Sequence, residues 1–214
     1  HTLRNQIKVK LVAIAKDEAP YLPYWIYHHF SIGIDFIEIH LNGITDNSLE
    51  ICKKISNGDK RFTYFIGDRR LKKCLKRKQR YQSSAYNKSI KRTKKGKDSS
   101  THILFLDIDE YLVNTKGRNC IKRLVRSYPE ADAFSFLWYF EHWQGNKKAF
   151  ANPLTGHRSA VKARTLKTLI KVSSRIKSYD QHNAMYNENY QPKNLLAETG
   201  MHLIPKVNTN DGRN

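Results

Sequence analysis

Short apolar runs recur along the first half of the chain, and polar, turn-forming residues follow each of them. The runs are rich in β-branched and aromatic residues and only a few residues long, as in strands buried on both faces of a sheet. Strands are predicted at residues 9–15, 36–41 and 62–66. Helices are predicted over 22–33 and, capped by Asp46 or Asn47, through Ile55. This alternation predicts an α/β fold with a mostly parallel, twisted sheet flanked by helices.

A fourth apolar run, residues 102–106, leads directly into three acids. Asp107, Asp109 and Glu110 lie within four positions of one another. In parallel α/β sheets, ligands bind beyond the carboxyl ends of the strands. We therefore expect these acids to lie at the ligand-binding edge of the sheet.

The alternation of apolar runs and polar turns weakens after Asp109. A helix is expected near 121–126 and a strand at 133–140, followed by a polar stretch without clear periodicity that we expect to be irregular. No repeat or low-complexity linker divides the chain. The prediction is a single domain over residues 1–214, with a first half at 1–112 and a second half at 113–214.

Positive charge is the strongest feature of the composition. Lys and Arg number 39 against 19 Asp and Glu, a formal net charge of +20. Residues 69–97 contain fourteen Lys and Arg and no acid, and predict a helix followed by a basic loop at 94–97. Such a field favours an anionic partner: a phosphorylated small substrate, nucleic acid or an acidic membrane surface. Arg77 and Arg80 are candidates for binding a diphosphate; alternatively, the basic residues form a solvated face or bind nucleic acid.

The sequence predicts a soluble, cytoplasmic protein. Its apolar runs are far shorter than the roughly 20 residues that a membrane-spanning helix needs. The three cysteines, Cys52, Cys74 and Cys120, are widely separated and lack CxxC spacing, so we expect free thiols rather than a disulfide framework or a zinc site.

The acids after the fourth strand suit a divalent cation. Asp107 and Asp109 are two positions apart, which places them on one side of extended backbone. Carboxylate oxygens are preferred ligands of Mg²⁺ and Mn²⁺, which bridge diphosphate oxygens and neutralise a phosphate leaving group. The alternative is a structural role, with the acids balanced by basic neighbours.

Six segments in order resemble the nucleotide-sugar glycosyltransferases of the GT-A fold, and among them the family 2-like and DUF23-like group. The segments are Lys16-Asp17-Glu18 with Tyr21-Leu22, Trp25, His28-His29 and Gly33; Asn42 to Asp46; Gln82, Ala85, Tyr86 and Asn87; Phe105 to Tyr111; Trp138, Phe140 and Gly145; and Lys167, Ile170 and His182. The chain departs from the pattern at Asp17 for Asn, Tyr24 for Glu, Leu41 for an acid and Ile44 for Ser. It also resembles the N-terminal transferase domains of capsid-glycosylating proteins of large DNA viruses, which implies a viral protein in the host cytoplasm.

The resemblance implies a UDP-sugar donor, a glycan or glycoprotein acceptor, and Mn²⁺ or Mg²⁺. It also implies that residues 1–112 form the nucleotide-sugar-binding half and residues 113–214 the acceptor-binding half. The donor would contact Ala13, Lys16, Glu18, Asn42, Asp46, Asp107 and Ile108, besides Arg77 and Arg80. The cation would be held by Asp107, Asp109 and His182, with His157 and His202 as rivals for the histidine. Alternatively, Asn42 forms only a turn, Glu18 only complements a helix dipole, and Trp25, His28 and His29 only pack.

An inverting transfer, favoured by analogy, needs a base to take the acceptor proton. Glu141, which follows a predicted strand beside His142 and Trp143, is the candidate, with Asp180 and Glu198 behind it. Nearby aromatic residues suit either sugar stacking or core packing.

Two other classes remain open. A basic nucleic-acid-binding module would use the positive charge but leave Asp107 and Asp109 without a role. A metal-dependent phosphoryl or nucleotidyl transferase would use the same acids, although no GxxxxGK loop is present. No stable nucleic-acid partner is expected.

Overall fold

The computed structural model describes residues 6–112, 120–143, 158–180, 182–198 and 202–207. The helices are α1 (Leu22–Ser31), α2 (Ser48–Gly58), α3 (Asp68–Lys76), α4 (Tyr81–Lys94) and α5 (Cys120–Ser127). The strands are β1 (Val9–Ala15), β2 (Phe36–Leu41), β3 (Phe62–Ile66), β4 (His102–Phe105), β5 (Ala133–Trp143), β6 (Arg158–Lys171), β7 (Ile176–Asp180), β8 (Asn183–Tyr186), β9 (Lys193–Glu198) and β10 (His202–Val207).

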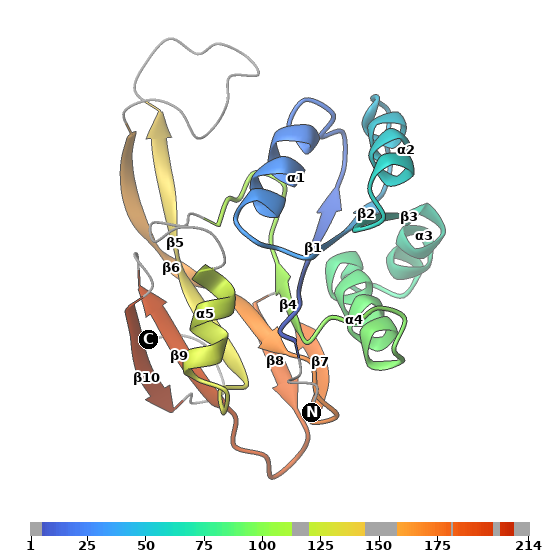
Figure 1. Cartoon of the computed structure of the whole chain (residues 1–214). Coiled ribbons are helices and arrows are strands. Elements are labelled where there is room, and N and C mark those ends of the chain that lie inside the picture. The colour runs from blue at the N-terminus through green and yellow to red at the C-terminus, as the bar shows by residue number, and fades with distance from the viewer. Residues whose placement is uncertain (1–5, 113–119, 144–157, 181, 199–201, 208–214) are drawn as a thin grey trace.

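One sheet runs through both halves of the chain. Its eight strands lie in the order β10-β9-β5-β6-β4-β1-β2-β3 (Figure 1). The pairs β3–β2, β2–β1, β1–β4 and β5–β9 are parallel, whereas β4–β6, β6–β5 and β9–β10 are antiparallel. The predicted α/β class is confirmed: the sheet is mostly parallel and carries helices on both faces.

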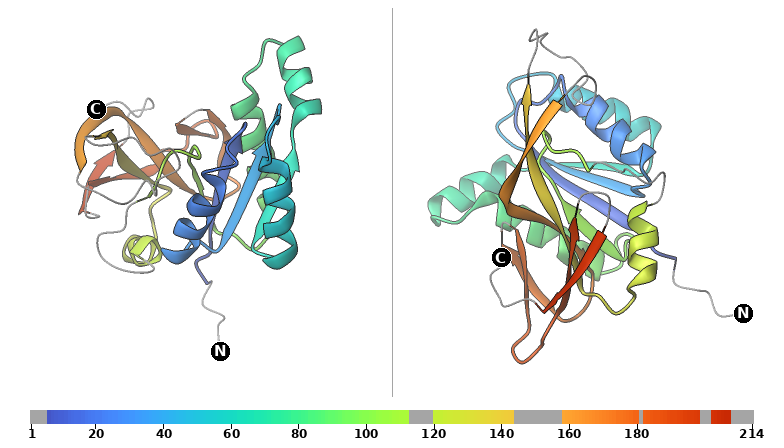
Figure 2. Two further views of the ribbon diagram at one scale, coloured as in Figure 1. Left: turned by 90° about the horizontal axis from the view of Figure 1, so that it is seen from above. Right: turned by 90° about the vertical axis from the view of Figure 1, so that its left-hand side faces the viewer.

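Each face of the sheet has its own cover (Figure 2). On one face, α1, α2 and α5 bury a core that includes Leu11, Ile39 and Leu104. On the other face, α4 and the two-stranded β7–β8 sheet bury a second core that includes Val12 and Phe105. Strand β1 lies in the middle of the sheet, which explains its almost wholly apolar sequence. Among the helices described, none is long and apolar enough to span a membrane.

Two sequence predictions of local structure were wrong. The polar stretch after residue 140 was expected to be irregular, but it supplies β6 to β10. Its buried positions include Lys167 and Thr168, whose polarity conceals a strand pattern. The basic stretch forms two helices, α3 and α4, rather than one, because the chain turns at residues 77–80; the predicted basic loop follows the end of α4 at residues 95–97.

Candidate functional site

The carboxyl ends of β1, β2 and β4 meet at one edge of the sheet, because these neighbouring strands are parallel. Three loops therefore lie side by side there: residues 16–21, 42–47 and 106–112. They carry most of the residues predicted to bind donor and cation. This edge is the candidate functional site.

Carboxylates tie the first two loops together. Asp17 Oδ1 accepts the backbone N–H of Thr45 at 2.6 Å and of Asp46 at 3.2 Å, and these bonds, led by that of Thr45, lower the pKa of Asp17. In return, Asp46 accepts the N–H of Ala19 at 2.9 Å and of Ser48 at 2.9 Å. Asp46 thus binds the backbone at the start of α2, as predicted, while Asn47 in the N-cap position makes no side-chain cap. Both acids are engaged in shaping the loops.

The predicted turn after β2 forms hydrogen bonds to two neighbouring elements. Asn42 is buried, and its Nδ2 donates to the carbonyl of Ala15 at 3.4 Å. Gly43 follows with φ of +57°, a conformation that glycine adopts without strain, and its N–H donates to Asp68 of α3 at 2.7 Å. The turn therefore links β1, β2 and α3.

Helix α1 holds the acidic loop after β4 in place through hydrogen bonds to the loop backbone. The indole Nε1 of the fully buried Trp25 donates to the carbonyls of Asp107 at 3.1 Å and Glu110 at 2.8 Å. Within the loop, Asp107 N–H donates to Oε2 of Glu110 at 2.8 Å. His29 donates from Nδ1 to the Trp25 carbonyl and accepts the N–H of Leu112 at Nε2, which fixes its neutral tautomer. The α1 histidines and tryptophan therefore position the acids, consistent with packing rather than chemistry.

Lys167 balances two of the three acids. Its Nζ lies 3.1 Å from Oδ2 of Asp107 and 2.8 Å from Oε1 of Glu110. Burial raises the pKa of Glu110, and the charge of Lys167 opposes that rise. Gln82 of α4 approaches the other Asp107 oxygen at 3.5 Å. The sequence pointed to Lys167 only as part of a motif, because its contacts with Asp107 and Glu110 depend on the pairing of β6 with β4.

Asp109 is placed differently. Its side chain is exposed, and it makes no hydrogen bond or ion pair with the residues that the structure describes. Burial raises the pKa of Glu18, and the next largest contributions are the negative charges of Asp109 and Asp46. Negative charge therefore accumulates at this edge, despite the +20 of the whole chain. A cation would relieve that repulsion.

His182 lies on the turn between β7 and β8, close enough to the acids to interact electrostatically. Burial lowers its pKa, the charge of Lys167 lowers it further, and Asp107 opposes the change. Its Nδ1 is buried and has no hydrogen-bond partner within the described part of the chain. A neutral imidazole with an unused nitrogen is suited to be a metal ligand or a hydrogen-bonding group.

The α4 residues that resemble the family pattern hold this turn in place. Asn87 donates to the Tyr179 carbonyl at 2.9 Å and accepts the Tyr179 N–H at 2.8 Å. Ser83 donates to Asp180 at 2.9 Å. Tyr86 packs against Phe105, with ring centroids 4.4 Å apart. Together these contacts bring the β7–β8 hairpin, and with it His182, to the end of β4.

The other residues predicted to contact the sugar-nucleotide donor fall into two groups. Ala13 and Ile108 are buried in the core, so only their backbone is available to a ligand. Lys16, Arg77 and Arg80 are exposed, and Arg80 immediately precedes the helix whose Gln82 approaches Asp107. Glu141 lies in β5, paired with Ala160, but its side chain lies outside the described residues, as do those of His202 and Glu198.

No three His, Cys, Asp or Glu side chains within the described ranges are grouped closely enough to hold a metal by themselves. Mg²⁺ is commonly bound by one or two carboxylates together with substrate phosphates, rather than by a cage of protein ligands. The carboxylate of the exposed Asp109, together with that of Asp107, fits a cation bound in that way.

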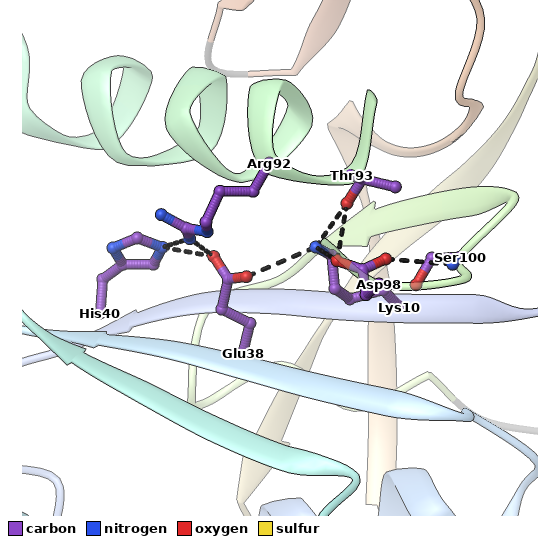
Figure 3. Close-up of polar contacts among 7 residues, drawn as sticks. All are labelled: Lys10, Glu38, His40, Arg92, Thr93, Asp98 and Ser100. Atoms are coloured by element: carbon purple, nitrogen blue, oxygen red, sulfur yellow. Dashed lines mark hydrogen bonds and ion pairs between the residues drawn. The ribbon is translucent and has the colours of Figure 1, made fainter. Parts of the chain in front are cut away.

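A buried polar network under the sheet was not predicted (Figure 3). Lys10 Nζ lies 3.4 Å from Glu38 and 2.7 Å from Asp98, and Arg92 of α4 also pairs with Glu38. Burial alone would raise the pKa of Glu38, but the hydrogen bond from His40 and the charges of Lys10 and Arg92 lower it to about 2. The network fastens α4 to β1 and β2, so part of the basic stretch is structural.

Comparisons with known proteins give remote similarities only. No protein-family model and no curated protein matches the chain. Among solved structures, S. aureus TarS 1–349 aligns with a TM-score of 0.45 at 12% identity, over 66% of this chain and 39% of that one. The same protein in complex with UDP gives 0.42 at 13%, over 61% and 35%. A 4-diphosphocytidyl-2C-methyl-D-erythritol synthase gives 0.42 at 10%, over 77% and 75%. The chain thus spans about two fifths of the TarS 1–349 structure, and values this low do not establish a shared activity.

Proposed function

We propose that the chain is a metal-dependent glycosyltransferase that moves a hexose from a UDP-sugar to a hydroxyl of a glycan or glycoprotein. The observation that carries the proposal is the exposed carboxylate of Asp109, which has no ion-pair partner among the described residues and lies at the edge where β1, β2 and β4 end. Burial, and after it the negative charges of Asp109 and Asp46, raise the pKa of Glu18 at the same edge. The motif order of the sequence, from Lys16 to His182, supports the same class.

In this proposal Asp109 and Asp107 hold the cation together with the diphosphate, and His182 supplies a further ligand through its neutral ring. The cation would supply charge neutralisation of the leaving diphosphate. Lys167, 3.1 Å from Oδ2 of Asp107, fixes the orientation of that carboxylate. Exposed Arg77 and Arg80, at the turn before α4, add charge-assisted hydrogen bonds to the phosphates.

The transfer itself needs a base on the acceptor side if the configuration inverts. We assign that role to Glu141, from its place in β5 of the second half. There it would take the proton of the acceptor hydroxyl as the oxygen attacks the sugar carbon. The loops tied by Asp17 and Asp46 would hold the nucleotide without reorganising, which favours binding.

Calorimetric titration tests the proposal. UDP, UDP-glucose, UDP-galactose and UDP-N-acetylglucosamine are titrated into the protein with Mn²⁺ and with EDTA. We expect binding with Mn²⁺ only, and a loss of at least tenfold in affinity for Asp109→Asn. Glu50→Gln, an exposed acid on α2, is the matched control and retains wild-type affinity.

Three results would overturn the proposal: no nucleotide binding, binding that persists in EDTA, or binding unchanged in Asp109→Asn. Salt-sensitive binding of DNA or RNA in place of nucleotide would identify the nucleic-acid-binding module. Metal-dependent turnover of a nucleotide without transfer of a sugar would identify a phosphoryl or nucleotidyl transferase.

A further inference from the structure

A cavity lies away from the acidic edge. It has a volume of about 380 Å³ and lies between the sheet at β5 and β6 and the segment that runs from β8 to β9. Ser135 and Thr168, which face each other across β5 and β6, are among its lining residues. Ala133, the first residue of β5, also lines it, whereas Asp107 follows the carboxyl end of the parallel β4. The cavity is therefore separate from the candidate functional site.

Carboxamide and hydroxyl groups dominate the lining. Five side chains are amides, two are tyrosines and two are aliphatic hydroxyls, and only one carries a charge. They are Asn183, Asn187, Asn189, Gln191 and Asn194; Tyr186 and Tyr190; Ser135 and Thr168; and the acid Glu188. No Lys or Arg is among the lining residues of this cavity, although the chain carries 39 of them. An anionic ligand has no counter-charge here.

Two polar atoms around the cavity are unsatisfied. Tyr186 Oη and Asn194 Oδ1 are buried, and neither has a hydrogen-bond partner among the described residues. Neither atom is open to solvent, so each side chain must turn toward the cavity to meet a ligand there. A buried polar group without a partner costs roughly 1–3 kcal/mol, and a ligand that supplies the missing partner after such a turn gains that energy. The phenol accepts or donates and the amide oxygen accepts, so the complementary ligand carries hydroxyl groups.

One wall of the cavity is held rigidly. Tyr190 Oη donates to Asp132 at 2.6 Å and accepts from Arg175 at 2.8 Å, and the Arg175 guanidinium lies 4.5 Å from the ring centroid. Tyr186 lies against it, with ring centroids 5.7 Å apart. Together with Met185 and Pro192 these rings provide apolar surface beside the amides. Alternating apolar and hydrogen-bonding surface matches a pyranose, whose C–H faces and hydroxyl edges alternate in the same way.

We propose that this cavity is a binding site for a neutral saccharide. Amides and hydroxyls both donate and accept, as sugar hydroxyls do, and the volume lies in the ~300–1,000 Å³ range of small-molecule sites. This saccharide site involves neither the cation site nor the nucleotide site, so its test does not depend on the proposed transfer reaction.

Saturation-transfer NMR tests it, with methyl β-glycosides of glucose, galactose, mannose and N-acetylglucosamine as probes and glucose 6-phosphate as the anionic comparison. At least one methyl glycoside is expected to give a signal that exceeds that of glucose 6-phosphate and persists in saturating UDP and Mn²⁺. Titration should then show a loss of about tenfold in affinity for Asn194→Ala and a smaller loss for Tyr186→Phe.

The matched controls are Asn57→Ala and Tyr27→Phe, exposed residues on α2 and α1 that should leave saccharide binding unchanged. Tyr186→Phe removes one oxygen only, so the test holds even if Asn194→Ala fails to fold. Absence of any signal, preference for glucose 6-phosphate, or retention of binding in Tyr186→Phe would overturn the proposal. Displacement of the glycoside by UDP would do so too, because the sugar would then occupy the nucleotide site.

Discussion

The ammonium of Lys167 lies 3.1 Å from Oδ2 of Asp107, so the first acid of the DxD pair already has a counter-charge. The same ammonium pairs with the buried Glu110 at 2.8 Å. Within the described part of the chain, the third acid, Asp109, has no such partner. The two aspartates therefore differ in electrostatic environment, although the sequence presents them as equivalent.

Replacing Lys167 by Met tests this pairing. Glu110 would be left buried without a cation, and breaking a buried pair costs about 3–5 kcal/mol. We expect the free energy of unfolding, measured by urea denaturation, to fall by about 3 kcal/mol. Lys53→Met removes an ion pair at the surface and should change it by less than about 1 kcal/mol. Equal effects of the two substitutions would contradict the assignment.

Trp25→Phe tests how the acidic loop is positioned. The substitution retains an aromatic ring but removes the donor shared by the Asp107 and Glu110 carbonyls. We expect a loss of about 1–3 kcal/mol in the free energy of unfolding. Nucleotide affinity in Mn²⁺ should fall as well, although no ligating side chain changes. Tyr24→Phe, an exposed position one residue away on α1, is the control, and nucleotide affinity there should equal wild type.

Acid should destabilise the protein in two stages. Burial lowers the pKa of His29 to about 3 and of His102 to about 4, so the folded state disfavours protonation that the unfolded state accepts near 6.5. Their stabilisation is complete above pH 6.5 and is lost as pH falls. Between pH 6.5 and 5.5 the two histidines together should cost about 2 kcal/mol. The carboxylate of Glu38, with its pKa lowered to about 2, adds a further loss below pH 4.5.

Urea denaturation at pH 7.5, 6.5, 5.5 and 4.0 measures these stages. His29→Gln should be less stable at neutral pH but should lose less stability between pH 6.5 and 5.5. Glu38→Gln should reduce the loss below pH 4.5 to the part due to the two histidines, whereas Glu50→Gln, on an exposed acid, should leave both stages unchanged. A free energy of unfolding that is flat down to pH 5 would contradict the neutral, buried state of the two histidines.

The first half of the fold was predictable because its burial follows hydrophobicity. Strand β1 is apolar at six of seven positions and lies in the interior of the sheet, between β4 and β2. The exception, Lys10, is buried because Glu38 and Asp98 pair with it. Those partners come from β2 and from the loop after α4, and no local pattern links them.

The same reasoning explains what was missed in the second half. Lys167 and Thr168 are buried in β6 because Glu110 and Ser135 lie opposite them, so their burial depends on strand register. The sequence identified Asp107, Asp109 and His182 through motif order, and the structure places His182 within electrostatic reach of Asp107 and Lys167. Whether the three bind a cation stays a prediction.

Gly67 marks a close approach behind the site. A Cβ at this position would lie 1.8 Å from Tyr81 Oη and 2.9 Å from the Leu41 carbonyl, although the backbone itself is compatible with alanine, with φ of −98°. Gly67→Ala should therefore force β2, α3 and α4 apart and lower the free energy of unfolding by about 1–3 kcal/mol. Gly58→Ala is the matched control, because its Cβ would meet nothing within 4 Å at the end of α2. That change should be neutral or stabilise by up to about 1 kcal/mol.

Adding Tyr81→Phe to Gly67→Ala should restore only part of the loss, since the ring and the carbonyl would still be too close. Full recovery in the double variant would show that the tyrosine hydroxyl alone sets the spacing between β2 and α4.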